Sequence, residues 1–299
     1  MKWLSVALVF GMLFSSCQQF LRPEGGGPKK TTRELQGLNG PVRSVFVAVA
    51  VPVNKSGAWE PGEQKPVSVE TYDKRGNRTE HVHYTAEGTI SNTIVFTYDT
   101  QGNETEAIRY DTNGVTESRT VSTYDAEGRR TESRSYTTND TLTHRTVFSY
   151  GTQGHETAAH NYAPEGALVS STTSTYDIEG NLAETSWYYA DSKPGSRVVY
   201  RRDAKGLLLS SISFDYAPDG TLQSRTDATY DGRGNPTEAI WYSEGGRFKR
   251  RETSTYRYDV FGNWIQRTTT HWVTVGNASF FEPPRVTYRT VTYYDKGME

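Results

Sequence analysis

A phrase of the form Tyr-Asp-x-x-Gly recurs along this chain at a nearly constant spacing, and no other feature constrains the fold as strongly. The spacing between successive copies is 26 residues five times and then 28 residues twice. The opening positions are Tyr72, Tyr98, Tyr124, Tyr150, Tyr176, Arg202, Tyr230 and Tyr258. A fixed period of this length indicates one small structural unit repeated in tandem.

The chemistry of the phrase predicts a tight turn. Asp accepts hydrogen bonds from the backbone just after it, and Gly adopts a left-handed conformation that side chains resist. The residues assigned to turn formation are Asp73, Gly76, Asp99, Gly102, Asp125, Gly128, Asp177, Gly180, Asp231, Gly234, Asp259 and Gly262. Because the phrase lacks the alternating oxygen ligands of a calcium loop, we predict no metal site here.

Each period has room for two strands. A second aromatic position follows 12 residues after most openings, and Val, Thr and Tyr, which favour strands, fill the segments between the turns. We therefore predict an all-β fold, an antiparallel meander of tandem hairpins of about 26 residues each. Because so many strands accumulate twist, the meander should form a long, twisted and curled sheet.

Alternation along the strands predicts which side chains share a face. In the strand after each turn, a Glu column begins with Glu80 and Glu106 and shares a face with the second aromatic column. The Thr one position earlier, such as Thr105, should point to the opposite face. Two carboxylates on one face are the minimum for glycoside hydrolysis, but a regular column singles out no position.

The N-terminus predicts export. A short apolar run after Lys2 is typical of a signal peptide, which we assign to residues 1–16. The segment LFSSC resembles a bacterial lipobox, which implies that Cys17 carries lipid, palmitate included, and anchors the protein to a membrane. Residues 17–36, rich in Gly, Pro and Lys, are predicted to be a flexible tether, and residues 37–299 the repeat domain.

Composition excludes some partners. The net charge is −2 and the sequence pI about 6.3, with no long basic run, so we predict no nucleic-acid partner. The sequence contains no phosphate-binding loop, dinucleotide fingerprint or nucleophile elbow, so we predict no cofactor and no catalytic residue. His81 and His83 share a strand face, but no third His lies in that stretch to complete a metal site.

The tryptophans are the candidate ligand-binding residues. Trp187 and Trp241 occupy the same repeat position two repeats apart, and Trp264 follows nearby. Exposed aromatic side chains on a sheet can stack on sugar rings, whereas buried ones would only thicken the core. The sequence leaves both alternatives open.

The phrases YDKRGNRTE, YDTQGNETE, YDIEGNLAE and YDGRGNPTE resemble the YD repeat of the RHS family over about residues 68–295. The opening LNGPVRSV and the closing segment YDVFGNWIQRT…VTYRTVTYYD look like those of small bacterial RHS-repeat lipoproteins. The resemblance implies a repeated strand architecture. It does not extend to a toxin function, because no C-terminal toxin domain follows the repeats.

Together these features predict a lipid-anchored, non-enzymatic protein of the cell envelope that acts as a binding or scaffold surface. The expected location is the outer membrane or cell surface, facing the periplasm or the exterior. An envelope glycan or protein is the expected partner. The first alternative is a carbohydrate-binding module that uses the tryptophan face, and a lesser alternative is an envelope glycan hydrolase.

Overall fold

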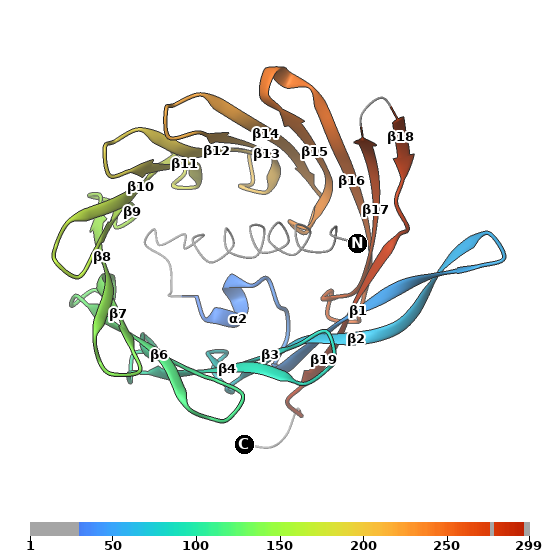
Figure 1. The fold of residues 1–299 in the computed structure, drawn as a ribbon. Helices are drawn as coiled ribbons and strands as arrows, with labels where there is room; N and C mark the ends of the chain where they lie inside the picture. Colours follow the sequence, from blue (N-terminus) through green and yellow to red (C-terminus); the bar gives the residue numbers. More distant parts are fainter. Residues whose placement is uncertain (1–29, 276–277, 296–299) are drawn as a thin grey trace.

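The computed structural model describes residues 30–275 and 278–295. Within these residues the chain forms one short α-helix, α2 (Thr32–Leu35), one 3-10 turn, η2 (Glu244–Gly246), and a single antiparallel sheet (Figure 1). The predicted signal peptide and Cys17 lie outside the described residues. The last part of the predicted tether forms α2, whose N-terminus is capped by Thr31 and Glu34 in a capping box.

The strands follow one another around the sheet in chain order. The first ten are β1 (Val42–Lys55), β2 (Ala58–Tyr72), β3 (Arg78–Tyr84), β4 (Ile90–Tyr98), β5 (Glu104–Tyr110), β6 (Thr116–Tyr124), β7 (Arg130–Thr137), β8 (Leu142–Tyr150), β9 (Glu156–Tyr162) and β10 (Leu168–Tyr176). The others are β11 (Leu182–Tyr189), β12 (Pro194–Arg202), β13 (Leu208–Tyr216), β14 (Leu222–Tyr230), β15 (Pro236–Ser243), β16 (Phe248–Tyr258), β17 (Trp264–Val275), β18 (Ala278–Phe281) and β19 (Arg285–Tyr293).

The sheet closes into a barrel of 18 strands, with β18 and β19 as two parts of one interrupted strand. β18 pairs with the end of β17, β19 pairs with the earlier part of β17, and Pro283 and Pro284 lie between them. Closure follows from the pairing of β1 with both β2 and β19 (Figure 1). The predicted long, curled sheet with two free edges is therefore wrong, although the all-β antiparallel meander is present.

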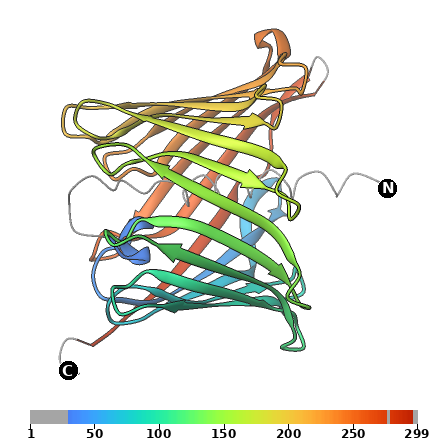
Figure 2. The ribbon, with the colours of Figure 1, turned by 90° about the vertical axis from the view of Figure 1, so that its left-hand side faces the viewer.

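The ends of the chain explain why the sheet closes. An open sheet of this length would leave two edges of unpaired backbone groups, and closure removes both. β1 is the most apolar strand of the chain, and its Val45 lies opposite Val291 of β19. In Figure 2 the strands cross the barrel wall obliquely, which is the tilt that closing a sheet requires.

The turns at one end of the barrel are those of the Tyr-Asp-x-x-Gly phrase. We call this the first-turn end, and the end with the turns that begin at residues such as Thr85 and Asp111 the second-turn end. At the turn after β4, the Asp99 carboxylate accepts hydrogen bonds from the N–H groups of Gln101 at 2.9 Å and Asn103 at 2.8 Å. Gly102 has a φ of 77°, in the left-handed region.

In four of the repeats, the tyrosine that opens the phrase fastens its hairpin to the preceding one. Its hydroxyl donates a hydrogen bond to the backbone carbonyl 20 residues earlier, on the neighbouring strand. The bonds run from Tyr98 to Arg78 at 2.8 Å, Tyr124 to Glu104 at 2.7 Å, Tyr150 to Arg130 at 2.8 Å and Tyr176 to Glu156 at 2.8 Å. Each bond gives a partner to a backbone carbonyl at the point where two strands diverge into separate turns. This role explains why Tyr occupies the position.

A β-bulge follows each of these turns. Between β6 and β7, for example, Thr123 pairs with Glu132 and Tyr124 with Arg130, so one extra residue, Thr131, is accommodated. The hydroxyls of Thr123 and Thr131 lie 3.0 Å apart, so both side chains are on one face together with Glu132. The expectation that Thr and the following Glu point to opposite faces is therefore wrong at this position.

Candidate functional site: the lumen of the barrel

Helix α2 identifies the inner face of the wall, because it lies inside the ring of strands (Figure 1). The hydroxyl of Thr32 on this helix lies 3.4 Å from that of Tyr98, and Gln36 donates to Glu70 at 3.2 Å. The opening tyrosines and the residues two positions before them therefore face the lumen. Strand alternation and the pairing register then show, for each remaining wall residue, whether it faces the lumen or the outside.

Hydroxyl and amide side chains line much of the lumen, and several are linked in pairs. Thr120 and Ser135 lie 3.1 Å apart, and Thr146 donates to Asn161 at 2.8 Å. Other inward-facing polar residues, placed by the same register, are Ser118, Ser122, Ser133, Ser170, Thr172, Ser211, Ser213, Ser224, Thr226, Ser254 and Thr269. Barrels of this strand number generally enclose an aqueous channel, so this lining would be hydrated.

All three candidate tryptophans face the lumen. Trp187 covers Gly195 so closely that a Cβ added there would lie 1.9 Å from ring carbon Cζ3. Trp241 has the guanidinium of Arg250 4.0 Å from its ring centroid. Trp187 and Trp241 lie near the second-turn end, whereas Trp264 begins β17 at the first-turn end. The structure therefore places the first two at the same end of the lumen, four strands apart, and leaves Trp264 at the other end.

Around Trp264 the wall carries arginines that sequence patterns did not single out. The guanidinium of Arg289 lies 3.6 Å from the Trp264 ring centroid and that of Arg267 lies 5.9 Å from it. Tyr256 meets the same ring edge-on, with centroids 6.0 Å apart. The sequence feature that could have identified these arginines is the alternation along β17 and β19, which puts Arg267 and Arg289 on the face shared with the opening tyrosines.

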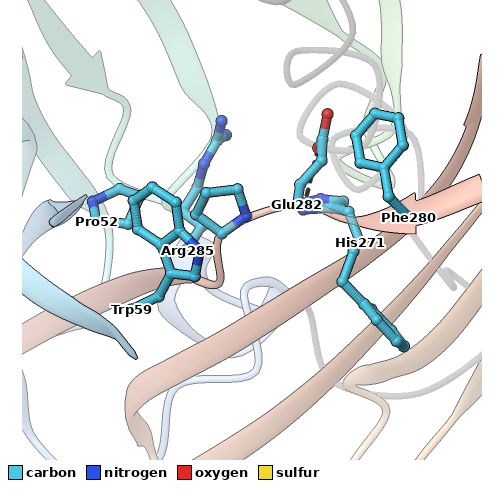
Figure 3. A pocket seen from close by; sticks show the side chains of 8 residues that line it. Pro52, Trp59, His271, Phe280, Glu282 and Arg285 are labelled. Atoms are coloured by element: carbon cyan, nitrogen blue, oxygen red, sulfur yellow. Dashed lines mark ion pairs between the residues drawn. The ribbon is translucent and has the colours of Figure 1, made fainter. Parts of the chain in front are cut away.

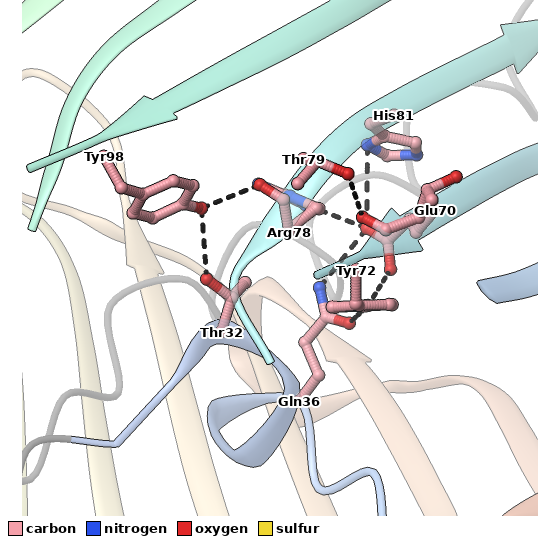
Figure 4. A network of polar contacts seen from close by, with 9 residues as sticks. Thr32, Gln36, Glu70, Tyr72, Arg78, Thr79, His81 and Tyr98 are labelled. Atoms are coloured by element: carbon pink, nitrogen blue, oxygen red, sulfur yellow. Dashed lines mark hydrogen bonds and ion pairs between the residues drawn. The ribbon is translucent and has the colours of Figure 1, made fainter. Parts of the chain in front are cut away.

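A polar network joins α2 to the wall at the first-turn end (Figure 4). The Glu70 carboxylate accepts hydrogen bonds from Arg78 at 2.8 Å, from the Tyr72 hydroxyl at 2.7 Å and from Gln36. Burial by itself would raise the pKa of Glu70, but Arg78 and His81 more than offset it and the pKa is lowered. The network holds one buried carboxylate in its ionised form.

The histidine pair lies beside this network. The rings of His81 and His83 are 3.9 Å apart, and the Nδ1 atom of His81 is 3.6 Å from Glu70. Burial lowers the pKa of His81 to about 4, although Glu70 acts in the opposite direction. Across the described ranges, no group of three or more His, Cys, Asp or Glu side chains is arranged to hold a metal ion.

The outer face of the wall is charged. Glu132 forms ion pairs with Arg134 at 2.5 Å and with Arg145 at 2.8 Å, and Glu184 pairs with Arg197 at 2.7 Å. The second tyrosine column shares this face, where guanidinium groups lie over the rings, for example at 5.4 Å between Arg145 and Tyr162. The Glu column that suggested a hydrolase thus lies outside the lumen, and its members Glu106, Glu132, Glu184 and Glu238 are paired with arginine.

The wall divides near the second-turn end. β1 pairs with β19 only as far as Ala50, while the end of β17 pairs with β18, so the β1–β2 hairpin and β18 diverge (Figure 1). A pocket of about 510 Å³ lies in this fork (Figure 3). Pro52, Trp59, His271, Phe280, Phe281, Glu282, Pro283 and Arg285 line it. His271 bonds Glu252 at 3.1 Å, so this polar pair borders the fork.

No protein-family model matches this chain, and no curated protein matches it. Among solved structures, it is similar to a porin-like protein from Bacteroides uniformis, with 12% identity and a TM-score of 0.45, covering 85% of this chain and 98% of the other. A DUF1329 family protein from Desulfovibrio piger has 9% identity and a TM-score of 0.26, covering 86% and 88%. A TcdB2-TccC3 structure has 16% identity and a TM-score of 0.21, covering 70% and 15%.

These findings correct the family expected from the sequence. The resemblance of the Tyr-Asp-x-x-Gly phrases to the YD repeat of the RHS family has no support from any family model. The sheet of this chain instead closes on itself as a barrel of 18 strands, whereas the resemblance led us to expect an open run of repeated strands. The predicted family assignment is therefore wrong. Within the described residues, no helix is long and apolar enough to cross a membrane.

Proposed function

We propose that this chain is a non-enzymatic binding protein of the cell envelope that holds a carbohydrate chain in the lumen of its barrel. The observation that carries the proposal is the placement of Trp187 and Trp241 on a lumen wall otherwise rich in hydroxyl and amide groups. A sugar ring has one apolar face that stacks on an indole and a rim of hydroxyls that hydrogen-bond to Ser, Thr and Asn. The wall offers both kinds of contact.

The outer face supports a barrel that stands outside the bilayer. A barrel that spans a membrane has an outward-facing apolar band about 25 Å tall. Here Glu132, Glu184 and their arginine partners occupy the outward positions in the middle of the strands. We infer that attachment would depend on lipid at Cys17, which would hold the barrel beside the membrane.

The binding proposal is tested with the full-length protein in detergent on an array of cell-wall and polysaccharide fragments. Trp187→Ala and Trp241→Ala should each weaken binding of the captured glycan about ten-fold, the effect of removing an aromatic anchor. Trp272→Ala is the matched control, because Trp272 faces outward against Phe281. The proposal fails if no glycan binds, or if binding is the same in all four proteins.

The anchoring proposal has a separate test. Cys17→Ala should move the protein from the membrane fraction to the soluble fraction, and globomycin should block its processing. If the variant partitions with membranes as the wild type does, lipid at Cys17 is not the anchor. The glycan measurement is independent of this outcome.

A further inference from the structure

Two guanidinium groups lie side by side on the lumen wall, and no carboxylate of the described residues forms an ion pair with either. Arg267 on β17 is directly opposite Thr287 on β19, and Arg289 is two residues further along the same face of β19. Cross-strand neighbours in this diagonal relation lie about 7–8 Å apart. Both side chains are half-buried, and among the described residues the Nε atoms of both are buried without a hydrogen-bond partner.

Two carboxylates act on this pair, but within the described residues neither forms an ion pair with it. Glu252 interacts with Arg267, and its carboxylate is bonded to His271 at 3.1 Å. Glu70 is close enough to favour the charged form of Arg289, but its oxygens are already hydrogen-bonded by Arg78, Tyr72 and Gln36. Burial, the largest effect, lowers the pKa of Arg289 to about 10, and repulsion from Arg267 acts in the same direction. The wall therefore holds positive charge that its own side chains do not fully compensate.

Two other lumen arginines, Arg78 and Arg202, each donate to an acceptor on the wall, although their Nε atoms are also buried without a partner among the described residues. The guanidinium of Arg78 also lies over an aromatic ring, 4.3 Å from the Phe96 centroid, but it has the Glu70 ion pair at 2.8 Å. Arg202 donates to the carbonyl of Gly206 at 3.1 Å. Arg267 and Arg289 differ because two like charges adjoin and share one aromatic platform, Trp264.

We propose that Arg267 and Arg289 form an oxyanion subsite that binds the carboxylate, phosphate or sulfate group of an acidic glycan, with a sugar ring against Trp264. This inference rests on the proposed function and names the chemical class of its ligand. Guanidinium groups suit such anions because their planar N–H pairs match two oxygens at once. Stacking on Trp264 fixes the plane of Arg289 before the ligand arrives, which reduces the ordering cost of binding.

The test compares a galacturonic-acid hexamer with its fully methyl-esterified form, which has the same rings but no charge. Wild-type protein should bind the acid at least about ten-fold more tightly, the effect of one charge-assisted hydrogen bond. Arg267→Gln and Arg289→Gln should each reduce that preference while leaving binding of the ester unchanged. Arg257→Gln, an outward-facing change on the neighbouring strand β16, should alter neither.

A second measurement separates the two proposals. Sodium sulfate and inorganic phosphate should each raise the melting temperature of the wild type, relative to sodium chloride of equal ionic strength, by more than they raise that of Arg289→Gln or Arg267→Gln. The general stabilising effect of these salts acts on all three proteins alike, so only the difference reports on the subsite. Equal binding of acid and ester would overturn the oxyanion subsite but leave the carbohydrate proposal standing. If neither hexamer binds, a sulfate effect that depends on both arginines still supports the subsite, and its absence overturns it.

Discussion

Removing the hydroxyls of the opening tyrosines should destabilise the barrel additively. Tyr124, Tyr150 and Tyr176 each donate to a backbone carbonyl at 2.7–2.8 Å on the preceding hairpin. A typical intramolecular hydrogen bond contributes about 0.5–1.5 kcal/mol, and a carbonyl left without a partner in a dry site costs about 1–3 kcal/mol. Because these tyrosines are half-buried and face a lumen, water can replace part of each bond, so we take about 1 kcal/mol per site.

The three sites lie on separate hairpins, so their effects should add. The triple change Tyr124→Phe, Tyr150→Phe and Tyr176→Phe should cost about 3 kcal/mol. For a protein of this size that corresponds to a melting temperature lower by roughly 6–12 °C, since each kcal/mol shifts it by about 2–4 °C. Circular dichroism at a β-sheet wavelength follows the transition, and urea titration gives an independent free energy of unfolding.

The control uses the second tyrosine column. Tyr110→Phe, Tyr136→Phe and Tyr162→Phe remove the same number of hydroxyls from the outer face but keep the rings that face arginines such as Arg119. This triple variant should unfold within about 1 kcal/mol of the wild type. If the two triple variants are equally stable, the bonds between hairpins do not contribute as argued.

Three further changes test other parts of the structure. Burial lowers the pKa of His81 to about 4 from 6.5 in the unfolded chain. Between these two pH values the unfolded state therefore binds more protons than the folded state, so the free energy of unfolding falls as the pH drops through this window. His81→Gln should remove up to about 3 kcal/mol of this loss of stability, which melting curves recorded at several pH values would measure. Ser192 has a φ of 63°, so Ser192→Gly should stabilise the barrel by about 1 kcal/mol in urea, and no gain would contradict left-handed strain there. Gly195→Ala should displace Trp187 and weaken glycan binding as much as Trp187→Ala does, at a cost of about 1–3 kcal/mol in stability; unchanged affinity would show that the position of this ring does not matter.

Local structure could be predicted from the sequence because its causes are local. The Asp and Gly positions of the phrase determine where hairpins turn, and strand-forming residues fill the intervals. The assignment of Trp187 and Trp241 to one face followed from the same period, and both do lie on the lumen wall. Which face was concave could not be predicted, because alternation distinguishes two faces without saying which one curves inward.

Closure of the barrel depends on pairing between strands that are far apart in the chain, and the repeat period contains no information about such pairing. The decisive pairing is that of β1 with β19, where Val45 lies opposite Val291 and Phe46 opposite Thr290. Neither strand belongs to a complete repeat, so counting repeats gave a strand number but no information on the edges. The same reason explains why the arginines of β17 and β19 were missed, since they lie where the repeat departs from its pattern.

The bulge shows how one extra residue changes the function assigned to a column of side chains. Simple alternation separates Thr131 from Glu132, whereas the bulge places both on the outer face. Along each strand the next residues then alternate from this new starting point, so the second tyrosine column faces outward and the tryptophan before it faces inward. A barrel built without the bulge would present the Glu column to the lumen and the tryptophans to the outside. The carbohydrate proposal therefore depends on a backbone irregularity that recurs in the hairpins that carry Trp187 and Trp241.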